Sequence, residues 1–299
     1  MVKIILIRHA QSVSNTVYEG IRDELVPEVK GQFHTKDLYQ NCDEETKAKI
    51  IARIKESKLN TDIANSWLTP KGISQCVELR EELYKRFPNI KKVMISPMRR
   101  AILTFENLFE EYPSFKKGTL PITLIEEMRE ILGSASSMGC WTEDQLASLK
   151  YRHLYNFDFM KEYERPHFWF LYRLSKDLQI KAEQAFEGKT THEEKVQALL
   201  EQVASTAPKA WEHNESCYKR VQIARHKIEV ELMKNGYGDG ELCIISHQNT
   251  LGWFVADMNV DPENGFEIIG ERIKINNIEI IEYEFHGSTK TKKDQESKF

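Results

Sequence analysis

The stretch Ile4–Asn15 reads IILIRHAQSVSN, an apolar run that ends abruptly at a cation and an imidazole. The run Ile4–Ile7 is short, continuous and rich in isoleucine, which is typical of a strand buried on both faces of a sheet. Arg8 and His9 follow where this strand should end, and small and polar residues then lead to Asn15. In open α/β sheets, ligands bind beyond the carboxyl ends of the strands. The pair therefore indicates either a solvated strand end or a functional site.

The composition is that of a globular protein. The chain has 299 residues, of which 40% are hydrophobic and 29% charged, enough for one large α/β domain or two ordinary ones. The net charge of −4 and the sequence pI near 6.2 predict no broad electrostatic surface for nucleic acid or an anionic membrane. We therefore expect neither as a partner, although a local basic pocket is compatible with this balance.

The N-terminal apolar run is too short for the hydrophobic region of a signal peptide, and Arg8 interrupts it. No later segment approaches the ~18 apolar residues that a membrane-spanning helix needs. The cysteines of the chain are scattered and form no Cys-x-x-Cys pair; they are Cys42, Cys76, Cys140, Cys217 and Cys243. Reduced thiols and a cytoplasmic location are expected.

Further apolar runs repeat the pattern of the first. With Lys3–Ile7, the predicted buried strands are Lys92–Ile95, Ile122–Ile125 and Glu241–Ile245. Helical patterns lie between them, which favours βαβ units in a mostly parallel sheet. Arg272–Phe285 instead alternates apolar and polar residues. We expect one or two late strands there, as an antiparallel pair at the sheet edge that turns at Asn276-Asn277.

Capping residues mark the helices between these strands. Thr69-Pro70 offers an N-cap and a proline at the first helical position, and helical spacing continues to Pro88. Pro97 is expected to open a second helix. A long helix near Ser216–Lys234 should end at Asn235-Gly236.

Residues from about 141 to 215 have a different character. Capping-box patterns begin at Thr142 and Thr191, the stretch between Tyr151 and Tyr172 is rich in aromatic residues, and no strand is predicted. We expect a helical insertion packed over the α/β core. Its aromatic residues should lie mainly in the core. Alternatively, they form a wall at the mouth of the pocket, and Arg152, Arg165 or Arg173 reaches the substrate.

The predicted organisation is a single domain over residues 1–287 followed by a frayed polar tail at 288–299. Lys30–Ala64 is a second, polar excursion with a helical pattern. The fold class is a three-layer α/β/α sandwich with a mostly parallel sheet, an antiparallel edge strand and the helical insertion.

Charged residues follow the other predicted strands as well. The strand ends lead into Ser96-Pro97-Met98-Arg99-Arg100, into Ser246-His247-Gln248, and into Glu126, Glu127 and Glu130. If the strands are parallel, these residues meet at one edge of the sheet. The sequence then predicts a cationic pocket with an acid beside it.

Such a pocket suits a phosphoryl group. Guanidinium groups match phosphate oxygens and stabilise the charge that spreads over the transferring group. An imidazole nitrogen can attack phosphorus to form a phosphohistidine that water later cleaves, and neighbouring cations help to keep that histidine neutral. A nearby glutamic acid could protonate the leaving oxygen.

These motifs resemble the histidine phosphatase superfamily, in its phosphoglycerate mutase-like branch. The family's Arg-His-Gly block, with an Asn five positions after the Gly, is similar to Arg8-His9-Ala10 and Asn15. The other family blocks follow in order, as LTPKGISQ (68–75), SPMRRAILT (96–104), MREILG (128–133) and ISHQ (245–248). Ala10 and Gln248 stand where the family has glycine, and Gly133 arrives one position early.

The resemblance implies a metal-independent phosphomonoester hydrolase, similar to a histidine acid phosphatase, that needs no cofactor. It implies His9 as the nucleophile, Glu130 as the proton donor, and Arg8, Arg100 and His247 as the phosphate pocket. Asn15 and Gln248 are further phosphate-binding candidates. Glu126 and Glu127 remain alternatives to Glu130. No metal ligands are implied, and the scattered histidines at other positions have no helical partner that would suggest zinc.

The expected partner is a phosphorylated small molecule, with a phosphoprotein as a second possibility. A phosphoglycerate mutase-type phosphotransferase is the alternative within the same chemistry. Thr16–Asp23 (TVYEGIRD) lacks the Phe-x-Gly-Trp-x-Asp-like tract of the mutases, which favours the hydrolase. A catalytically weak protein that recognises a phosphorylated partner is the third reading, and the complete set of pocket residues speaks against it.

Overall fold

The computed structural model describes residues 2–25, 42–206, 212, 214–235, 240–261, 265–269 and 275–285. Its central sheet has the strand order β3-β2-β4-β1-β7. The strands are β1 (Val2–Arg8), β2 (Ile90–Ile95), β3 (Ile122–Leu124), β4 (Glu241–Ser246) and β7 (Ile280–Phe285). Neighbours among the first four are parallel, whereas β7 runs antiparallel to β1. The predicted mostly parallel sheet with an antiparallel edge strand is confirmed.

The C-terminal region differs in detail from the prediction. A turn at Asn276–Glu279, closed by the Glu279 N–H on the Asn276 carbonyl, leads into the single edge strand β7. Residues 272–274, where a first hairpin strand was expected, lie outside the described residues. A separate antiparallel pair, β5 (Asp257–Asp261) and β6 (Gly265–Ile269), was not predicted.

Alternate residues of β1 face opposite sides of the sheet, as the twofold period of a strand requires. Ile5 and Ile7 belong to one buried cluster, whereas Ile4 and Leu6 belong to another. All four side chains are fully buried. This explains why the run is continuously apolar: both faces of the strand are covered.

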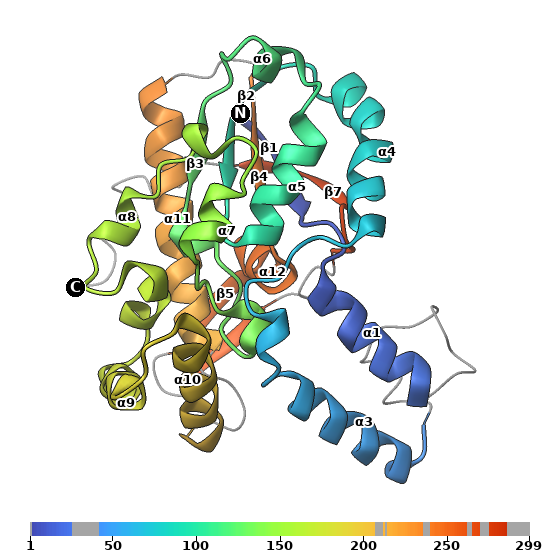
Figure 1. The fold of residues 1–299 in the computed structure, drawn as a ribbon. Coiled ribbons are helices and arrows are strands. Elements are labelled where there is room, and N and C mark those ends of the chain that lie inside the picture. The colour runs from blue at the N-terminus through green and yellow to red at the C-terminus, as the bar shows by residue number, and fades with distance from the viewer. Residues whose placement is uncertain are drawn as a thin grey trace, which may run out of the picture.

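Helices cover both faces of the sheet (Figure 1). The helices α4 (Pro70–Arg86) and α5 (Arg99–Phe109) pack on the Ile5 side, and α11 (Asn214–Asn235) and α12 (Gln248–Val255) pack on the Ile4 side. The result is the expected three-layer α/β/α arrangement. A short helix α6 (Pro113–Lys116) lies between α5 and β3.

One helix boundary was predicted wrongly. Thr69 caps α4 as expected, its hydroxyl accepting from the Gly72 N–H. However, α5 begins at Arg99 and not at Pro97. The Pro97 carbonyl accepts from the indole of Trp141, and the Ser96 hydroxyl accepts from the Met98 N–H. These bonds hold the residues before Arg99 in a non-helical turn.

The segment from Trp141 to Thr206 contains only helical elements and loops. They are α7 (Glu143–Ala147), η5 (Arg152–Leu154), α8 (Asp158–Lys161), η6 (Pro166–Arg173), α9 (Lys176–Phe186) and α10 (His192–Thr206). Both predicted capping boxes are present, at Thr142 and at Thr191. Trp141 and Trp169 are fully buried in the same cluster as Ile5 and Ile7, so the insertion extends the core on one side of the sheet.

Two helices project from the body beside the sheet edge (Figure 1). They are α1 (Val13–Leu25) and α3 (Glu44–Ser57), which contact each other, with Ile50 buried between them and Leu25 packed against it. The predicted excursion thus contains a helix over its described part, followed by η2 (Thr61–Ile63). Residues 30–41 of it lie outside the described residues.

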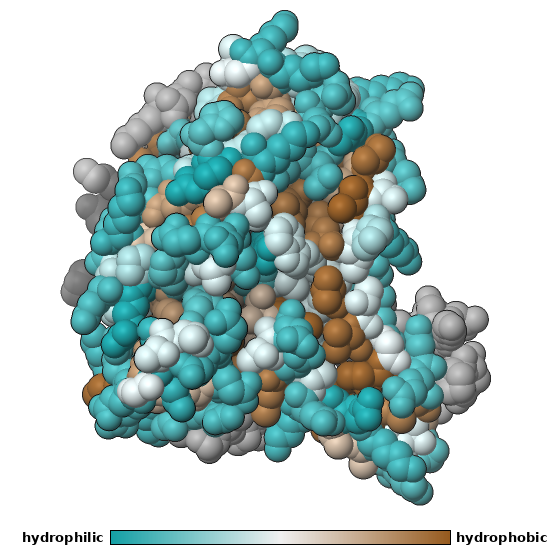
Figure 2. All heavy atoms as spheres, in the orientation of Figure 1, coloured by the Kyte–Doolittle hydropathy of each residue, from teal (hydrophilic) through white to brown (hydrophobic). Residues whose placement is uncertain are grey.

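Hydrophilic residues cover most of the face seen in Figure 2, in keeping with an apolar interior. Across the described ranges, no helix combines the length and the apolar character needed to cross a bilayer.

Candidate active site

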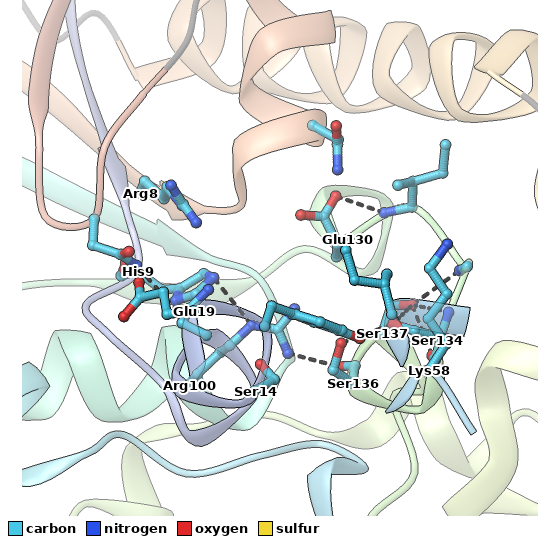
Figure 3. A pocket seen from close by; sticks show the side chains of 17 residues that line it. Arg8, His9, Ser14, Glu19, Lys58, Arg100, Glu130, Ser134, Ser136 and Ser137 are labelled. Atoms are coloured by element: carbon cyan, nitrogen blue, oxygen red, sulfur yellow. Dashed lines mark hydrogen bonds between the residues drawn. The ribbon is translucent and has the colours of Figure 1, made fainter. Parts of the chain in front are cut away.

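The carboxyl ends of β1, β2 and β4 meet at one edge of the sheet. The backbone bonds continue past each strand: the His9 N–H donates to the Ser246 carbonyl at 2.9 Å, and the Ser96 N–H to the Ile245 carbonyl at 3.0 Å. A pocket of about 470 Å³ opens here. Figure 3 shows that Arg8, His9, Arg100 and Glu130 all lie around it.

The hydrogen bonds of His9 define its tautomer. Its Nδ1 lies 2.8 Å from the Ala10 carbonyl oxygen, which can only accept, so Nδ1 carries the proton. Its Nε2 accepts a bond of 3.1 Å from Nε of Arg100 (Figure 3). The lone pair of His9 is therefore on Nε2, beside the Arg100 guanidinium.

His9 is also kept neutral. Its side chain is buried, and burial together with the charges of Arg100 and Arg8 holds its pKa well below the ordinary value of 6.5. A neutral imidazole with a fixed tautomer has an unprotonated nitrogen at every pH near neutrality. This is the protonation state that a nucleophile requires.

Neither arginine of the pocket has a carboxylate partner among the described residues. Nη1 of Arg8 donates to the Ile275 carbonyl at 2.9 Å, and its buried Nε has no hydrogen-bond partner. Arg100 donates to His9 and, at 2.7 Å, to the Ser136 carbonyl. Burial lowers the pKa of Arg100 to about 10, so it remains charged at neutral pH. Within the described residues, both arginines are hydrogen-bonded only to neutral groups.

His247 lies behind His9, with the two ring centroids 5.1 Å apart. It is fully buried, and burial, with the nearby Arg100, lowers its pKa well below 6.5. The Ser96 hydroxyl accepts from the Met98 N–H and lies 2.7 Å from Nε2 of His247. If that hydroxyl donates to Nε2, the proton of the neutral ring is on Nδ1, a buried atom with no partner. His247 then offers an unused donor next to His9.

Of the three candidate acids, the pocket contains Glu130. It follows η3 (Glu126–Met128), and its Oε1 accepts from the Ile131 N–H at 2.8 Å (Figure 3). Glu126 and Glu127 are buried in η3, where Glu127 forms an ion pair with Lys227 at 2.6 Å. Neither of these two lines the pocket.

A buried ion cluster fixes the loop that carries Glu130. Glu212 accepts bonds from Arg129 at 2.8 and 3.1 Å, from Arg220 at 2.9 Å and from the Leu132 N–H at 2.9 Å. Arg220 also donates to the carbonyl oxygen of Arg129. The residues on both sides of Glu130 are thus held by the same carboxylate.

The residues of the LTPKGISQ and SPMRRAILT blocks also hold the backbone around His9 in place. The N-terminus of α4 packs against the backbone just after His9: a Cβ at Gly72 would lie 2.1 Å from the Gln11 carbonyl oxygen, so only glycine fits there. Gln75 accepts from the Gln11 N–H, and Thr104 accepts from the Ala10 N–H. These contacts fix the turn that positions His9.

Asn15 lines the pocket, and its Oδ1 accepts from the Ser12 N–H and hydroxyl. Gln248, a predicted phosphate-binding residue, does not line it. The Oε1 atom of Gln248 accepts from the Ile275 N–H at 2.8 Å, and the neighbouring Asn249 lies at the pocket instead. His247 is likewise absent from the lining, and its ring lies next to that of His9.

Several lining residues were not predicted from the sequence: Ser14, Tyr18, Glu19, Ile54, Lys58, Ile131, Gly133, Ser134, Ser136, Ser137, Asn249 and Asn277. The serines follow the MREILG block directly, which is a usable signal, since hydroxyl groups beside a predicted acid suit polar substrates. Asn277 was interpreted only as a turn residue, but its side chain donates to the His9 carbonyl at 2.8 Å. Lys58 comes from the excursion, where no motif marks it.

The aromatic residues of the insertion lie in the core, and none of them lines this pocket. Arg152 donates to the Tyr155 carbonyl, and Arg165 pairs with Glu183. These contacts speak against an aromatic pocket wall served by Arg152 or Arg165, and the side chain of Arg173 lies outside the described residues. Among the described residues, no group of three or more His, Cys, Asp or Glu side chains could hold a metal ion.

Neither a protein-family model nor a curated protein matches this chain. Solved structures do. The ecdysone phosphate phosphatase of Bombix mori is 15% identical with a TM-score of 0.45, covering 94% of this chain and 88% of its own. Phosphoglycerate mutase from Bacillus anthracis is 14% identical with a TM-score of 0.40, covering 85% and 78%. Alpha-ribazole phosphatase from Shigella flexneri is 14% identical with a TM-score of 0.35, covering 92% and 100%. Two of these structures carry the name of a phosphatase and one that of a phosphoglycerate mutase, and none is more than 15% identical to this chain.

Proposed function

We propose that this protein is a phosphomonoester hydrolase that forms a phosphohistidine on His9 and needs no metal. The observation that carries the proposal is the state of His9. Its neutral ring presents an unprotonated Nε2 to a pocket with two arginines that lack a carboxylate partner among the described residues. That arrangement fits a dianionic group beside a nucleophile.

Binding of the phosphoryl group would use donors that the free pocket leaves available. Its oxygens would accept from Arg8, from Arg100 and from Nδ1 of His247. The Nε–H of Arg100 now bonds Nε2 of His9 and would move to a phosphoryl oxygen, which frees the lone pair for in-line attack on phosphorus. The two guanidinium groups would stabilise the charge on the transferring group.

In the first step the bond from His9 Nε2 to phosphorus forms as the bond from phosphorus to the ester oxygen breaks. Glu130, protonated, gives its proton to that leaving oxygen, so an alcohol departs. In the second step the Glu130 carboxylate takes a proton from water as the water oxygen attacks the phosphohistidine. Inorganic phosphate and neutral His9 result, and Glu130 is again protonated.

Hydrolysis of a generic aryl phosphate tests this proposal. His9→Ala should lower kcat by about 10⁴-fold or more, since the nucleophile is lost. His226→Ala, at an exposed position on α11, is the matched control and should leave kcat unchanged. Wild-type turnover that a chelator abolishes would overturn the metal-free mechanism, and a His9→Ala variant as active as the wild type would overturn the nucleophile.

The role of Glu130 is tested by the leaving group. Glu130→Gln should lower kcat by about 10²- to 10³-fold on an alkyl phosphate, whose leaving oxygen needs a proton, and much less on a nitrophenyl phosphate. Glu127→Gln is the matched control from the same loop. A loss that is equal for both substrates, or one seen only in Glu127→Gln, would assign the acid elsewhere.

The mutase-type alternative uses the same His9 intermediate but passes the phosphoryl group to a substrate hydroxyl. The partitioning of the phosphoryl group between water and an added hydroxyl compound decides between the two. Release of inorganic phosphate in equal amount to alcohol is expected for the hydrolase, whereas transfer of most of the phosphoryl group to an added hydroxyl compound would favour the phosphotransferase.

A further inference from the structure

A second cavity, of about 230 Å³, lies on the other side of the segment that carries Arg100. Its walls come from η2 and the loop after it, from the start of α5, from the loop before α7 and from α10. Arg99, Trp67, Ser66, Cys140 and His192 are among its lining residues. None of these residues lines the first pocket.

The side chain of Arg99 is exceptional in this cavity. Arg99 is only 3% exposed, and its Nε is buried with no hydrogen-bond partner. Its guanidinium lies over the ring of Trp67, and its backbone N–H donates to Asn65. Within the described part of the chain, no hydrogen bond or ion pair engages the guanidinium itself. By contrast, the adjacent Arg100 donates to both His9 and a carbonyl.

A buried cation without a counterion is costly. Removing a guanidinium from water without replacing its hydrogen bonds costs several kcal/mol. Burial lowers the pKa of Arg99 to about 9, so the group is still charged at neutral pH. Stacking on an aromatic ring recovers ~1 to 2 kcal/mol of this cost and leaves the N–H donors unused.

The walls of the cavity do not supply the missing anion. The carboxylates of Asp62 and Glu193 also line it, but both residues are exposed and neither contacts Arg99. Cavities that hold drug-sized ligands are about 300 to 1,000 Å³. A cavity of about 230 Å³ therefore suits a smaller molecule.

We propose that this cavity is a second binding site, in which Arg99 receives a small oxyanion, either a carboxylate or a phosphate. The planar edge of a guanidinium stacked on one face matches the two oxygens of such a group. The proposal does not depend on the function proposed for the first pocket, because it uses none of that pocket's residues.

The two sites share a wall. Arg99 and Arg100 are consecutive residues at the start of α5, and each lines a different cavity. The hydroxyl of Ser66, in the second cavity, lies 3.2 Å from that of Ser14, in the first. Occupancy of the second site is therefore placed to affect the first.

Titration calorimetry of the full chain tests the proposal, with inorganic phosphate as one probe and malonate as the other. We expect Arg99→Gln to abolish one binding event seen in the wild type, and Arg99→Lys to weaken the same event by about tenfold, since a point charge replaces the fork. Arg100→Gln is the matched control from the neighbouring position and should leave that event intact. The probe that binds more tightly identifies the oxyanion.

Thermal stability separates a ligand site from a purely structural role. If Arg99 awaits an anion, Arg99→Gln should raise Tm in the absence of anions, since an uncompensated buried charge is removed, and should lose part of the rise in Tm that the better probe produces. The proposal is overturned if Arg99→Gln binds both probes with the number of sites and the affinities of the wild type. It is also overturned if the only event observed is one that Arg100→Gln removes.

Discussion

Two pairs of arginines lie close to the carboxyl ends of the strands, and they differ in their hydrogen-bond partners. Arg129 and Arg220 surround Glu212, which accepts charged hydrogen bonds from both, at 2.8 Å and 2.9 Å. Arg8 and Arg100 face the pocket and bond only carbonyl oxygens and His9. Arg100 is as buried as Arg129 and Arg220, and Arg8 is half-buried, so the main difference between the pairs is the counterion.

This contrast separates a structural ion cluster from a binding site. A buried charge that is paired within the chain is satisfied in the absence of ligand, and breaking the pair destabilises the fold. A buried charge that is left unpaired makes the fold less stable but binds an external anion more tightly, since its desolvation has already occurred. By this criterion Arg129 and Arg220 hold the loop of Glu130 in place, whereas Arg8 and Arg100 are proposed to bind the phosphoryl group.

The largest expected effect compares one arginine from each pair. Arg100→Gln should lower kcat/KM on a phosphomonoester by about 10²- to 10³-fold, as for loss of one donor to the transition state, with Tm unchanged or raised. Arg129→Gln should instead lower the free energy of unfolding by about 3 to 5 kcal/mol, because Glu212 loses a partner. Urea unfolding and steady-state kinetics on both variants measure the two quantities.

The comparison fails if the two variants behave alike. A strong loss of stability in Arg100→Gln would show that its bonds to His9 and Ser136 serve the fold. An Arg129→Gln variant of wild-type stability would show that Glu212 is satisfied without it.

The second prediction concerns pH, and the two regions should respond in different windows. The pKa of Glu212 is held at about 2, chiefly by Arg129 and Arg220 against its desolvation, compared with 4.5 for the free side chain. Its contribution of about 3 kcal/mol is present above pH 4.5 and is lost as the pH falls towards 2, where the folded state also takes up the proton.

The pocket histidines affect the stability of the fold at higher pH than Glu212 does. His9 and His247 have pKa values well below 6.5 in the fold, so the unfolded chain takes up protons first as the pH falls through 6.5. Stability should therefore begin to fall below about pH 7. Urea unfolding from pH 8 to pH 3 should show both phases, and His247→Gln should reduce only the upper one. A wild-type profile that is flat between pH 7 and pH 5 would contradict the neutral pocket.

The sequence predicts the residues of the pocket far better than those of the ion cluster around Glu212. His9, Arg100, His247 and Glu130 each follow a predicted apolar strand by a few residues, so the local pattern and the rule on strand ends place them together. Glu212 pairs with Arg129 across a separation of 83 residues, and no local pattern marks either partner. Long-range charge pairing of this kind becomes visible only once the chain is folded.

The elements of the fold also divide into those that a local sequence pattern marks and those that it does not. The parallel strands carry short apolar runs that are evident from the sequence, whereas the β5–β6 pair is short and mixed in polarity. Its first strand, Asp257–Asp261, begins and ends in aspartate, so no continuous apolar run marks it in the sequence. The error at Pro97 has another origin: a proline near a helix start marks the region, but the side chains of Ser96 and Trp141 decide the residue at which α5 begins.

The smallest effect is expected for a third kind of cation, one in contact with solvent. Lys58 lines the pocket at the C-terminal end of α3, it is only partly buried, and no ion pair engages it within the described residues. Figure 3 places it near Ser134 and Ser137, on the side of the pocket away from Arg8. An exposed charge is screened by water and salt, so its contribution to binding is ~1 kcal/mol or less.

Lys58→Met should therefore raise KM for an anionic phosphomonoester by about two- to fivefold and leave kcat unchanged. The increase should disappear at 1 M salt, where the Debye length is about 3 Å. Lys55→Met, exposed on the same helix but outside the pocket, controls for the overall change in charge. If Lys58→Met lowers kcat, or if its effect persists at high salt, Lys58 contacts the transferring group as Arg8 and Arg100 are proposed to do. The division between desolvated cations that drive the reaction and solvated cations that only attract the substrate would then not hold at this side of the pocket.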